Sequence, residues 1–275
     1  MLNNTMSAYS NSSICSQRRG GFTLVELLVV ISIISMLMSI LLPNLIAARE
    51  MGHRIVCQAN MRSLTFAWNA YTIEYNDRLC SPDTLYNNDG EIDYNWVADG
   101  PDDPANTIGG TEQAIKDGVL APLLSDTTGV YKCKSDSTDL LRSYSISNVM
   151  GGYTCGCGNM TRPYYSMGQI KDPAGKLVFI DADSVLPAGE PKWIQRGFWP
   201  VDRDARTWVI AQENNITARH GDGTNLTFAD NHCEYRRWKD PRTIAIANWD
   251  FSTANMDGDN KDLDYLLLIL RGPYD

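Results

Sequence analysis

The side chains that could hold a transition metal are few in this sequence, which has three histidines and seven cysteines. Imidazole nitrogen and thiolate sulfur are the ligands that zinc prefers. No CxxC pair or other strong ligand spacing supports a zinc site, however. We therefore favour a structural role for His220, in which its ring hydrogen-bonds across a hairpin turn to Asp230. The residues from which a zinc site could be assembled are His220, His232, Cys233, Cys155 and Cys157.

An acidic segment near the C-terminus, residues 257–264, offers ligands of a different kind. Clustered carboxylate and amide oxygens on a loop suit a hard cation such as calcium. The segment departs from the EF-hand template, because the glycine and the bidentate glutamate of that template are not in their places. A bound calcium ion and a solvated acidic loop are therefore both open. The carboxylates concerned are those of Asp257, Asp259, Asp262 and Asp264.

No pattern in the sequence is typical of a catalytic centre. A Ser-His-Asp order, a nucleophile elbow and a metalloprotease helix are all missing. The net charge of −9 and the isoelectric point near 4.8 argue against a nucleic-acid binder, which would need a basic face. We expect neither an enzyme nor a protein with a nucleic-acid partner.

The element that dominates the chain is an apolar segment at residues 24–42. It reads LVELLVVISIISMLMSILL, in which only Glu26 and three serines are not apolar. As a helix it would span roughly 28 Å, close to one bilayer core. The segment is longer than the apolar part of a secretory signal, and it continues into Pro43 without a small-residue cleavage site. We therefore predict a single transmembrane helix.

Glu26 within this segment and Pro43 directly after it call for a physical explanation. A carboxylate such as Glu26 inside an apolar helix costs about 2.5–3.5 kcal/mol on insertion scales, so we expect it to have a partner or a function. The alternative is that Glu26 lies at headgroup depth, one turn into the helix. Pro43 lacks a backbone N–H and is expected to kink or locally melt the helix.

The hexapeptide GFTLVE, which begins at Gly21, resembles the processing site of type IV pilins and type II secretion pseudopilins. The resemblance covers residues 18–60. It implies that a prepilin peptidase cuts after Gly21 and methylates the new amine of Phe22. It also places the family's acid at Glu26 and its helix-kinking proline at Pro43. Pairing of Glu26 with the Phe22 amine of a neighbouring subunit would then fix the axial register of a filament.

This resemblance implies a structural subunit of a type II secretion pseudopilus or a type IV pilus-like filament. Its expected location is the bacterial inner membrane, with a single pass and the head in the periplasm or on a surface filament. The implied partners are the prepilin peptidase, other pilin or pseudopilin subunits, an assembly platform protein, a motor ATPase and the lipid bilayer. The alternative is a membrane-tethered or filament-tip module that binds a polysaccharide or a secreted substrate.

Several segments of the head resemble one pilin-like family of large proteins with a prepilin-type N-terminus. His220 is followed nine residues later by Asp230, which resembles the H-X9-DG element of that family. Asn231 stands in place of the glycine, and asparagine also tolerates the left-handed conformation. Residues 133–136 and 143–145, CKSD and SYS, resemble the family's Cys-Pro-Ser-Asp and Ser-Tyr segments, and residues 172–181 also look similar. This second resemblance implies a pilus-like role and little chemistry.

Beyond Pro43 the helical pattern becomes amphipathic. Apolar side chains recur three and four residues apart, which predicts a helix that packs one face against a sheet. One long helix is therefore expected from about residue 23 to 76, ended by Asn76 and Asp77. The apolar stripe consists of Cys57, Met61, Leu64, Trp68, Tyr71 and Tyr75.

The remaining chain has the pattern of an α+β head. Residues 81–110 are rich in turn formers and predict a long surface loop. Residues 263–270 predict a final buried strand or short helix. Short strands with a hairpin at the Gly221-Asp222-Gly223 turn predict an antiparallel sheet against the long helix. The strand candidates are residues 177–180, 207–210, 215–219, 225–229 and 233–238.

The expected domain organisation follows from the processing site. Residues 1–21 form the leader, residues 22–77 the long helix with its transmembrane part at 24–42, and residues 78–275 the globular head. Loss of the leader would change the side-chain charge from −9 to −11, because Arg18 and Arg19 are removed.

The loss of Cys15 with the leader would leave an even number of cysteines, six, in the mature chain. Periplasmic folding is oxidising, so we expect disulfides in the head. The sequence does not choose among the many connectivities. Cys57, on the helix stripe, is the best candidate for a buried free thiol. The disulfide candidates are Cys80, Cys133, Cys155, Cys157 and Cys233.

Overall fold

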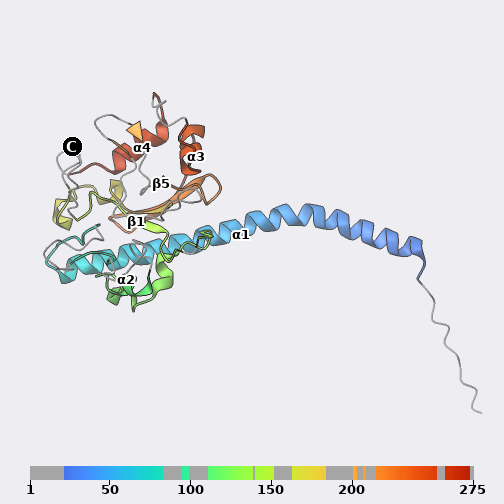
Figure 1. Cartoon of the computed structure of the whole chain (residues 1–275), viewed down its shortest axis with the longest axis horizontal. Helices are drawn as coiled ribbons and strands as arrows, with labels where there is room; N and C mark the ends of the chain where they lie inside the picture. The colour runs from blue at the N-terminus through green and yellow to red at the C-terminus, as the bar shows by residue number, and fades with distance from the viewer. Residues whose placement is uncertain are drawn as a thin grey trace, which may run out of the picture. The chain divides into compact units, whose positions relative to one another are not determined.

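The chain separates into two units at a point within its first helix. Helix α1 spans Leu24–Glu74, and the division falls after Ala47 (Figure 1). The computed structural model describes residues 22–82, 94–98, 111–138, 140–151, 163–183, 201–202, 207–208, 215–252 and 258–272. The predicted leader, residues 1–21, lies outside the described residues.

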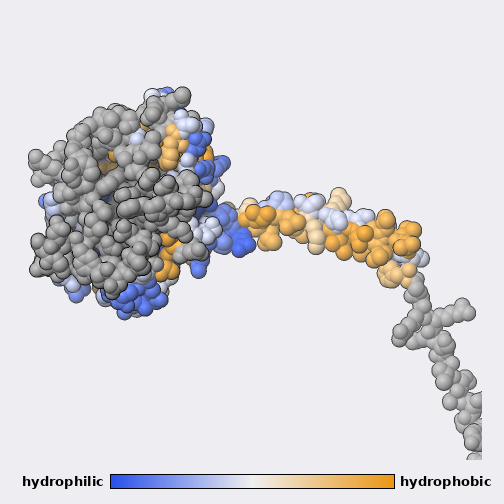
Figure 2. Space-filling view, in the orientation of Figure 1, coloured by the Kyte–Doolittle hydropathy of each residue, from blue (hydrophilic) through white to orange (hydrophobic). Residues whose placement is uncertain are grey.

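The part of α1 in the first unit is apolar on all sides. Its large hydrophobic side chains are exposed from Leu24 to Ile46, and Figure 2 shows apolar side chains over most of its visible face. By length and composition this helix can cross a membrane, as the pattern of residues 24–42 predicts. The hydroxyl of Ser32 donates to the Leu28 carbonyl at 2.7 Å. Such internal bonds satisfy the polar side chains without water.

The helix continues through Pro43, so the local melting that the sequence allowed is not present in the structure. Proline removes one backbone hydrogen bond of the helix. Neighbouring side chains donate to backbone carbonyls around it: the hydroxyl of Ser39 bonds to Met36 at 2.7 Å and the amide of Asn44 bonds to Ile40 at 3.0 Å. The helical backbone is thus supported on both sides of the proline.

The second unit is built on an antiparallel sheet in the order β1-β2-β6-β7. The central strand is β2 (Leu177–Asp183), which pairs with β1 (Tyr144–Ile146) on one side and β6 (Gly223–Phe228) on the other. Strand β7 (Cys233–Arg237) pairs with β6. The predicted α+β class, with a long helix and an antiparallel sheet, is confirmed.

The predicted hairpin across Gly221 is wrong. Strand β5 (Asn215–Ile216) pairs with the end of β2, and not with β6. The hairpin is instead formed by β6 and β7, whose turn contains Asn231 at a φ of 71°. The pattern of turn residues is similar at both places, and the long-range pairing with the central strand decides between them.

The apolar stripe of α1 packs into the core as predicted. Its side chains from Cys57 to Tyr71 are buried in one cluster with Val178 and Phe179 of β2. Only Tyr75 of the stripe is exposed, at 47%, where it stacks on Tyr71 with ring centroids 4.3 Å apart. Helix α1 ends at Glu74, and Asn76 and Asp77 follow with positive φ.

A second apolar cluster lies under two short helices, α3 (Pro241–Ala247) and α4 (Lys261–Ile269). It contains Leu177 and Ile180 of β2. Side chains alternate between the two faces of a strand, so β2 contributes to both clusters, and the register shift between Leu177 and Phe179 places Leu177 on the side of Ile180. The predicted final element is thus the helix α4. The remaining elements are α2 (Glu112–Lys116), the 3-10 turns Pro122–Leu124, Thr128–Tyr131, Met167–Gln169 and Pro173–Gly175, and the paired strands β3 (Val201–Asp202) and β4 (Thr207–Trp208).

The prediction of a surface loop over residues 81–110 fails for its described middle part. Trp96 and Val97 are fully buried in the cluster under α1. The backbone of Ser81 forms a bridge with that of Asn95, which holds the segment in the core. Turn-forming residues on both sides of a short apolar stretch concealed this burial.

Gly151 lies where its backbone closely approaches the backbone of Cys80. Its φ is +98°, and a Cβ added there would lie 1.8 Å from the carbonyl oxygen of Cys80. We expect Gly151→Ala to lower the free energy of unfolding by at least about 2 kcal/mol. Gly52→Ala is the matched control, because nothing lies within 4 Å of its added Cβ and alanine favours helix. Thermal unfolding of the full chain in detergent measures both, and equal melting temperatures would contradict the close approach.

Candidate functional site

The N-terminus of α1 carries the residues of the predicted processing and assembly site. Phe22 is 79% exposed. The backbone N–H and the hydroxyl of Thr23 both donate to Oε2 of Glu26 at 2.8 Å, and the Glu26 N–H donates back to the Thr23 hydroxyl at 3.2 Å. This reciprocal pattern is a capping box, which satisfies N–H groups that a helix start leaves unpaired. Gly21 lies outside the described residues.

Glu26 therefore has an intrachain role that our sequence analysis missed. The signal was available, because T-x-x-E before an apolar run is the signature of a capping box. Both bonds end on Oε2, and Oε1 makes no hydrogen bond in the described part of the chain. One carboxylate oxygen is thus left for a second partner.

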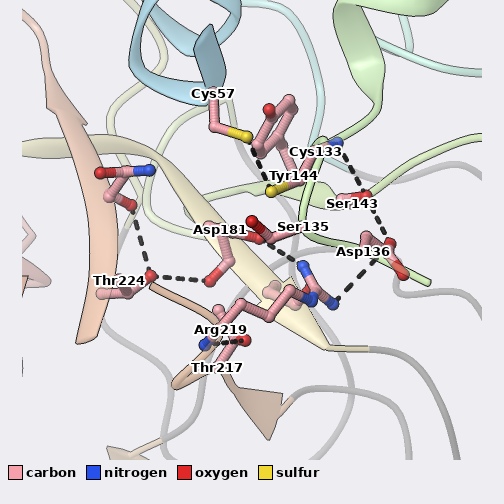
Figure 3. Close-up of polar contacts among 12 residues, drawn as sticks. Cys57, Cys133, Ser135, Asp136, Ser143, Tyr144, Asp181, Thr217, Arg219 and Thr224 are labelled. Atoms are coloured by element: carbon pink, nitrogen blue, oxygen red, sulfur yellow. Dashed lines mark hydrogen bonds and ion pairs between the residues drawn. The ribbon is translucent and has the colours of Figure 1, made fainter. Parts of the chain in front are cut away.

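The second unit contains a cluster of polar side chains between α1 and the sheet, buried except for Glu50, whose side chain is 37% exposed. They come from distant parts of the chain: Glu50 and Cys57 lie on α1, Cys133 follows the 3-10 turn Thr128–Tyr131, and Asp181 lies on β2. His220 lies in the turn before β6 and is only 2% exposed. Part of this arrangement is drawn in Figure 3.

The ring of His220 contacts three of these side chains. Its Nδ1 lies 2.8 Å from Oε1 of Glu50. Its Nε2 lies 3.2 Å from Sγ of Cys133 and 3.2 Å from Oδ2 of Asp181. Burial alone would lower the pKa of His220, but hydrogen bonding to Asp181 and Glu50 outweighs burial and raises the pKa to about 10.

His220 and Asp230 do not form the hydrogen bond that we expected. Asp230 bonds instead to His232, with Oδ1 at 2.5 Å from Nδ1 and at 3.0 Å from the backbone nitrogen. His232 also stacks on Phe228, with ring centroids 4.3 Å apart. The two ends of the H-X9-DG-like element thus lie in separate environments, because the β6–β7 turn holds Asp230 and the preceding turn directs His220 inward.

Cys57 and Cys133 form the closest thiol pair of the described chain. Their sulfur atoms lie 2.8 Å apart and face each other in Figure 3. The backbone N–H of Lys134 donates to the Cys57 sulfur at 3.1 Å. The contact with Cys133 lowers the pKa of the Cys57 thiol, and the same contact together with burial raises that of Cys133. Cys57 therefore holds a negative charge more readily than an isolated thiol.

An arginine joins this cluster to the CKSD segment. Nη1 of Arg219 lies 2.5 Å from Oδ1 of Asp181, and its Nη2 lies 3.8 Å from Oδ2 of Asp136 (Figure 3). The hydroxyl of Ser143 donates to Asp136 and accepts from the backbone N–H of Cys133 at 3.0 Å. The CKSD and SYS segments, which both resemble the pilin-like family, therefore meet in space beside His220.

The disulfides predicted for the head are not seen among the described cysteines. Cys57, Cys80, Cys133 and Cys233 are free thiols in the structure. Cys80 is fully buried among apolar side chains, and this burial raises the pKa of its thiol. Cys155 and Cys157 lie outside the described residues. Among the described candidates, Cys80 and Cys133 are buried and Cys233 is half-buried.

The structure does not gather the described residues of the acidic segment into a metal site. Asp262 is buried, and its Oδ2 accepts the backbone N–H groups of Lys239 at 2.7 Å and Asp240 at 2.8 Å. Asp259 and Asp264 are exposed, and Asp257 lies outside the described residues. Asp262 serves to join α3 to α4, which explains its burial without calcium.

Our sequence analysis found His220, Cys133 and Cys57 but did not join them. It did not single out Glu50, and it named Asp181 only as the end of the family-like segment 172–181. Asp181 carried a signal, since a carboxylate directly after the buried run LVFI must have a partner. Glu50 carried none, because an acid in a polar turn of a helix is ordinary.

Comparison with known proteins gives a family match near the N-terminus and a similar curated protein. The family described as the prokaryotic N-terminal methylation motif matches residues 16–42. The type IV wide pilus major component PilA4 of Thermus thermophilus is 43% identical over 56 residues, which are 20% of this chain. The chain spans 43% of the length of that relative. No solved structure matches the chain.

These matches and the long apolar helix agree with each other. The matched residues 16–42 contain the GFTLVE sequence and most of the first unit of α1. The chain thus carries the prokaryotic N-terminal methylation motif and is similar over part of its length to a type IV pilin.

Proposed function

We propose that this chain is a structural subunit of a type IV pilus-like filament or a type II secretion pseudopilus. The observation that carries the proposal is the first unit of α1, whose large hydrophobic side chains are all exposed. An apolar helix of this length requires a bilayer or other apolar helices around it. A filament whose core consists of packed N-terminal helices provides these apolar surroundings after the subunit has left the membrane.

The same surface explains how the subunit is held before assembly. Residues 24–42 cross the bacterial inner membrane, and the second unit lies in the periplasm or on the surface of the filament. A prepilin peptidase cuts after Gly21 and methylates the amine of Phe22. An assembly platform and a motor ATPase then move the subunit from the membrane into the filament.

Glu26 sets the register of neighbouring subunits in this proposal. Its Oε2 is used by the capping box, and Oε1 is left to accept a bond from the Phe22 amine of the neighbour. An ammonium group and a carboxylate attract each other strongly in apolar surroundings, where either group alone is costly. The proposed role is structural, with no catalytic step assigned to the chain.

For a type IV pilus-like filament, the proposal predicts that the mature chain appears in sheared surface filaments. An epitope tag on the full chain, expressed in its own host with its assembly genes, allows the sheared and membrane fractions to be compared. We expect loss of the assembly ATPase to remove the chain from the sheared fraction and to leave it in the membrane. A chain that stays in the membrane whether or not the ATPase is present would contradict the filament role.

A further inference from the structure

The buried cluster beneath α1 has the composition and shape of a metal centre. We propose that Cys57, Cys133, His220 and Asp181 bind one zinc ion in a closed, tetrahedral structural site, with Glu50 as the partner of the histidine. The sulfur atoms of Cys57 and Cys133 and a ring nitrogen of His220 lie within 4.8 Å of one another. All three residues are at most 2% exposed.

Asp181 is the proposed fourth ligand, although its carboxylate lies outside the group formed by the other three ligand atoms and has to shift toward the sulfurs. Its side chain is fully buried, and Oδ1 is paired with Nη1 of Arg219. When Nε2 of His220 carries no proton, Oδ2 accepts no hydrogen bond from the described residues, although it lies 3.2 Å from that nitrogen. A buried carboxylate oxygen without a donor is expensive. A zinc ion between Oδ2 and Nε2 removes this cost, because both atoms then donate to the metal.

The tautomer of His220 fits this assignment. Nδ1 is 2.8 Å from the Glu50 carboxylate, so it carries a proton and donates it there. Nε2 then directs its lone pair toward Cys133 and Asp181. A carboxylate that orients a histidine through its second ring nitrogen is the usual surrounding of a zinc ligand. The hydroxyl of Ser135 donates to Glu50 at 3.1 Å and fixes this carboxylate in turn.

The distances between the proposed ligand atoms are slightly shorter than those in a tetrahedral zinc site. Zinc bonds of about 2.3 Å to sulfur and about 2.0–2.1 Å to nitrogen or oxygen hold tetrahedral ligand atoms about 3.3–3.8 Å apart. The Cys57–Cys133 sulfur distance is 2.8 Å, and Nε2 of His220 lies 3.2 Å from both Cys133 and Asp181. Small side-chain rotations close the difference. Binding releases the two thiol protons to solvent, and the positive charge of Arg219 offsets the excess negative charge of the ligands.

Two other states of the cluster are distinguishable from this one. A protonated His220 between Glu50 and Asp181 explains the histidine contacts, but it leaves the facing sulfurs of Cys57 and Cys133 without a role. A disulfide between the two cysteines explains the sulfurs, but it leaves Oδ2 of Asp181 without a donor when the ring is neutral. A zinc ion gives a role to all four ligand atoms, which are the two sulfurs, Nε2 of His220 and Oδ2 of Asp181. The site would tie α1 to the sheet through residues far apart in sequence.

The test uses the full chain in detergent under reducing conditions, with zinc chloride as the probe. After desalting, we expect one zinc ion per chain by plasma mass spectrometry. Cobalt in place of zinc should give the strong visible bands of a tetrahedral centre and a thiolate-to-cobalt charge-transfer band. Absence of bound zinc, or an octahedral cobalt spectrum, would overturn the proposal without any variant.

Variants then identify the ligands. Cys133→Ser and His220→Gln should retain less than about a tenth of the bound zinc, whereas the matched controls Cys233→Ser and His232→Gln should retain all of it. Glu50→Ala should weaken zinc affinity by about 10–100-fold, as expected for the partner of a ligand. Full zinc binding by Cys133→Ser would overturn the site, and so would a Cys57–Cys133 disulfide that persists in zinc-loaded protein.

Discussion

Glu26→Ala should lower incorporation of the chain into filaments by about tenfold or more, with cleavage after Gly21 unchanged. The variant removes the carboxylate that we propose as the partner of the Phe22 amine in the next subunit. An ammonium group left without a partner in apolar surroundings costs several kcal/mol. The measurement is the ratio of mature chain in sheared filaments to mature chain in membranes.

Glu26→Gln separates the two roles of this side chain. Glutamine also closes a capping box with Thr23, so the helix start is retained while the negative charge is lost. If pairing with the amine is the role that matters, Glu26→Gln should be as defective in assembly as Glu26→Ala. Normal incorporation of the glutamine variant would show that capping alone is required, and would refute the register role.

Trp68→Ala should produce the largest loss of stability. The side chain is completely buried between α1 and the sheet. Truncation of a buried tryptophan to alanine costs about 3–5 kcal/mol, because transfer energy is lost and a cavity remains. In a unit of this size, such a loss lowers the melting temperature by roughly 10 °C. Thermal unfolding of the full chain in detergent measures the change.

Phe66→Ala is the matched control for this substitution. Phe66 lies two residues earlier on the same helix, but its side chain is 56% exposed. An exposed site tolerates truncation within about 0.5 kcal/mol. A loss for Phe66→Ala that equals the loss for Trp68→Ala would contradict the assigned buried face of α1.

The long helix was predictable from sequence because its signals are local. Residues 24–42 are apolar almost without interruption, and the stripe from Cys57 to Tyr71 recurs at helical spacing. Each pattern depends on residues within one or two turns of each other. Asn76 and Asp77 then supply the left-handed conformations that end the helix.

The sheet and the buried cluster were predictable only in part, because they depend on long-range pairing. Strand β5 has the composition of a hairpin arm, yet its partner is the end of β2. His220 and Asp181 are 39 residues apart in the chain, and Cys57 precedes both by more than a hundred. Ligand spacing in sequence gives no signal when each residue comes from a different element. Only the register of β2, β6 and α1 brings these side chains together.

The central claim is that this chain is a processed filament subunit, and its N-terminus tests that claim most directly. The full chain is co-expressed with a prepilin peptidase, purified from membranes and analysed by intact mass and N-terminal sequencing. The account predicts a chain that begins at Phe22 with a methylated amine, and an uncut chain when Gly21 is replaced by valine. A chain that begins at any other residue, or that keeps residues 1–21 beside an active peptidase, would contradict it.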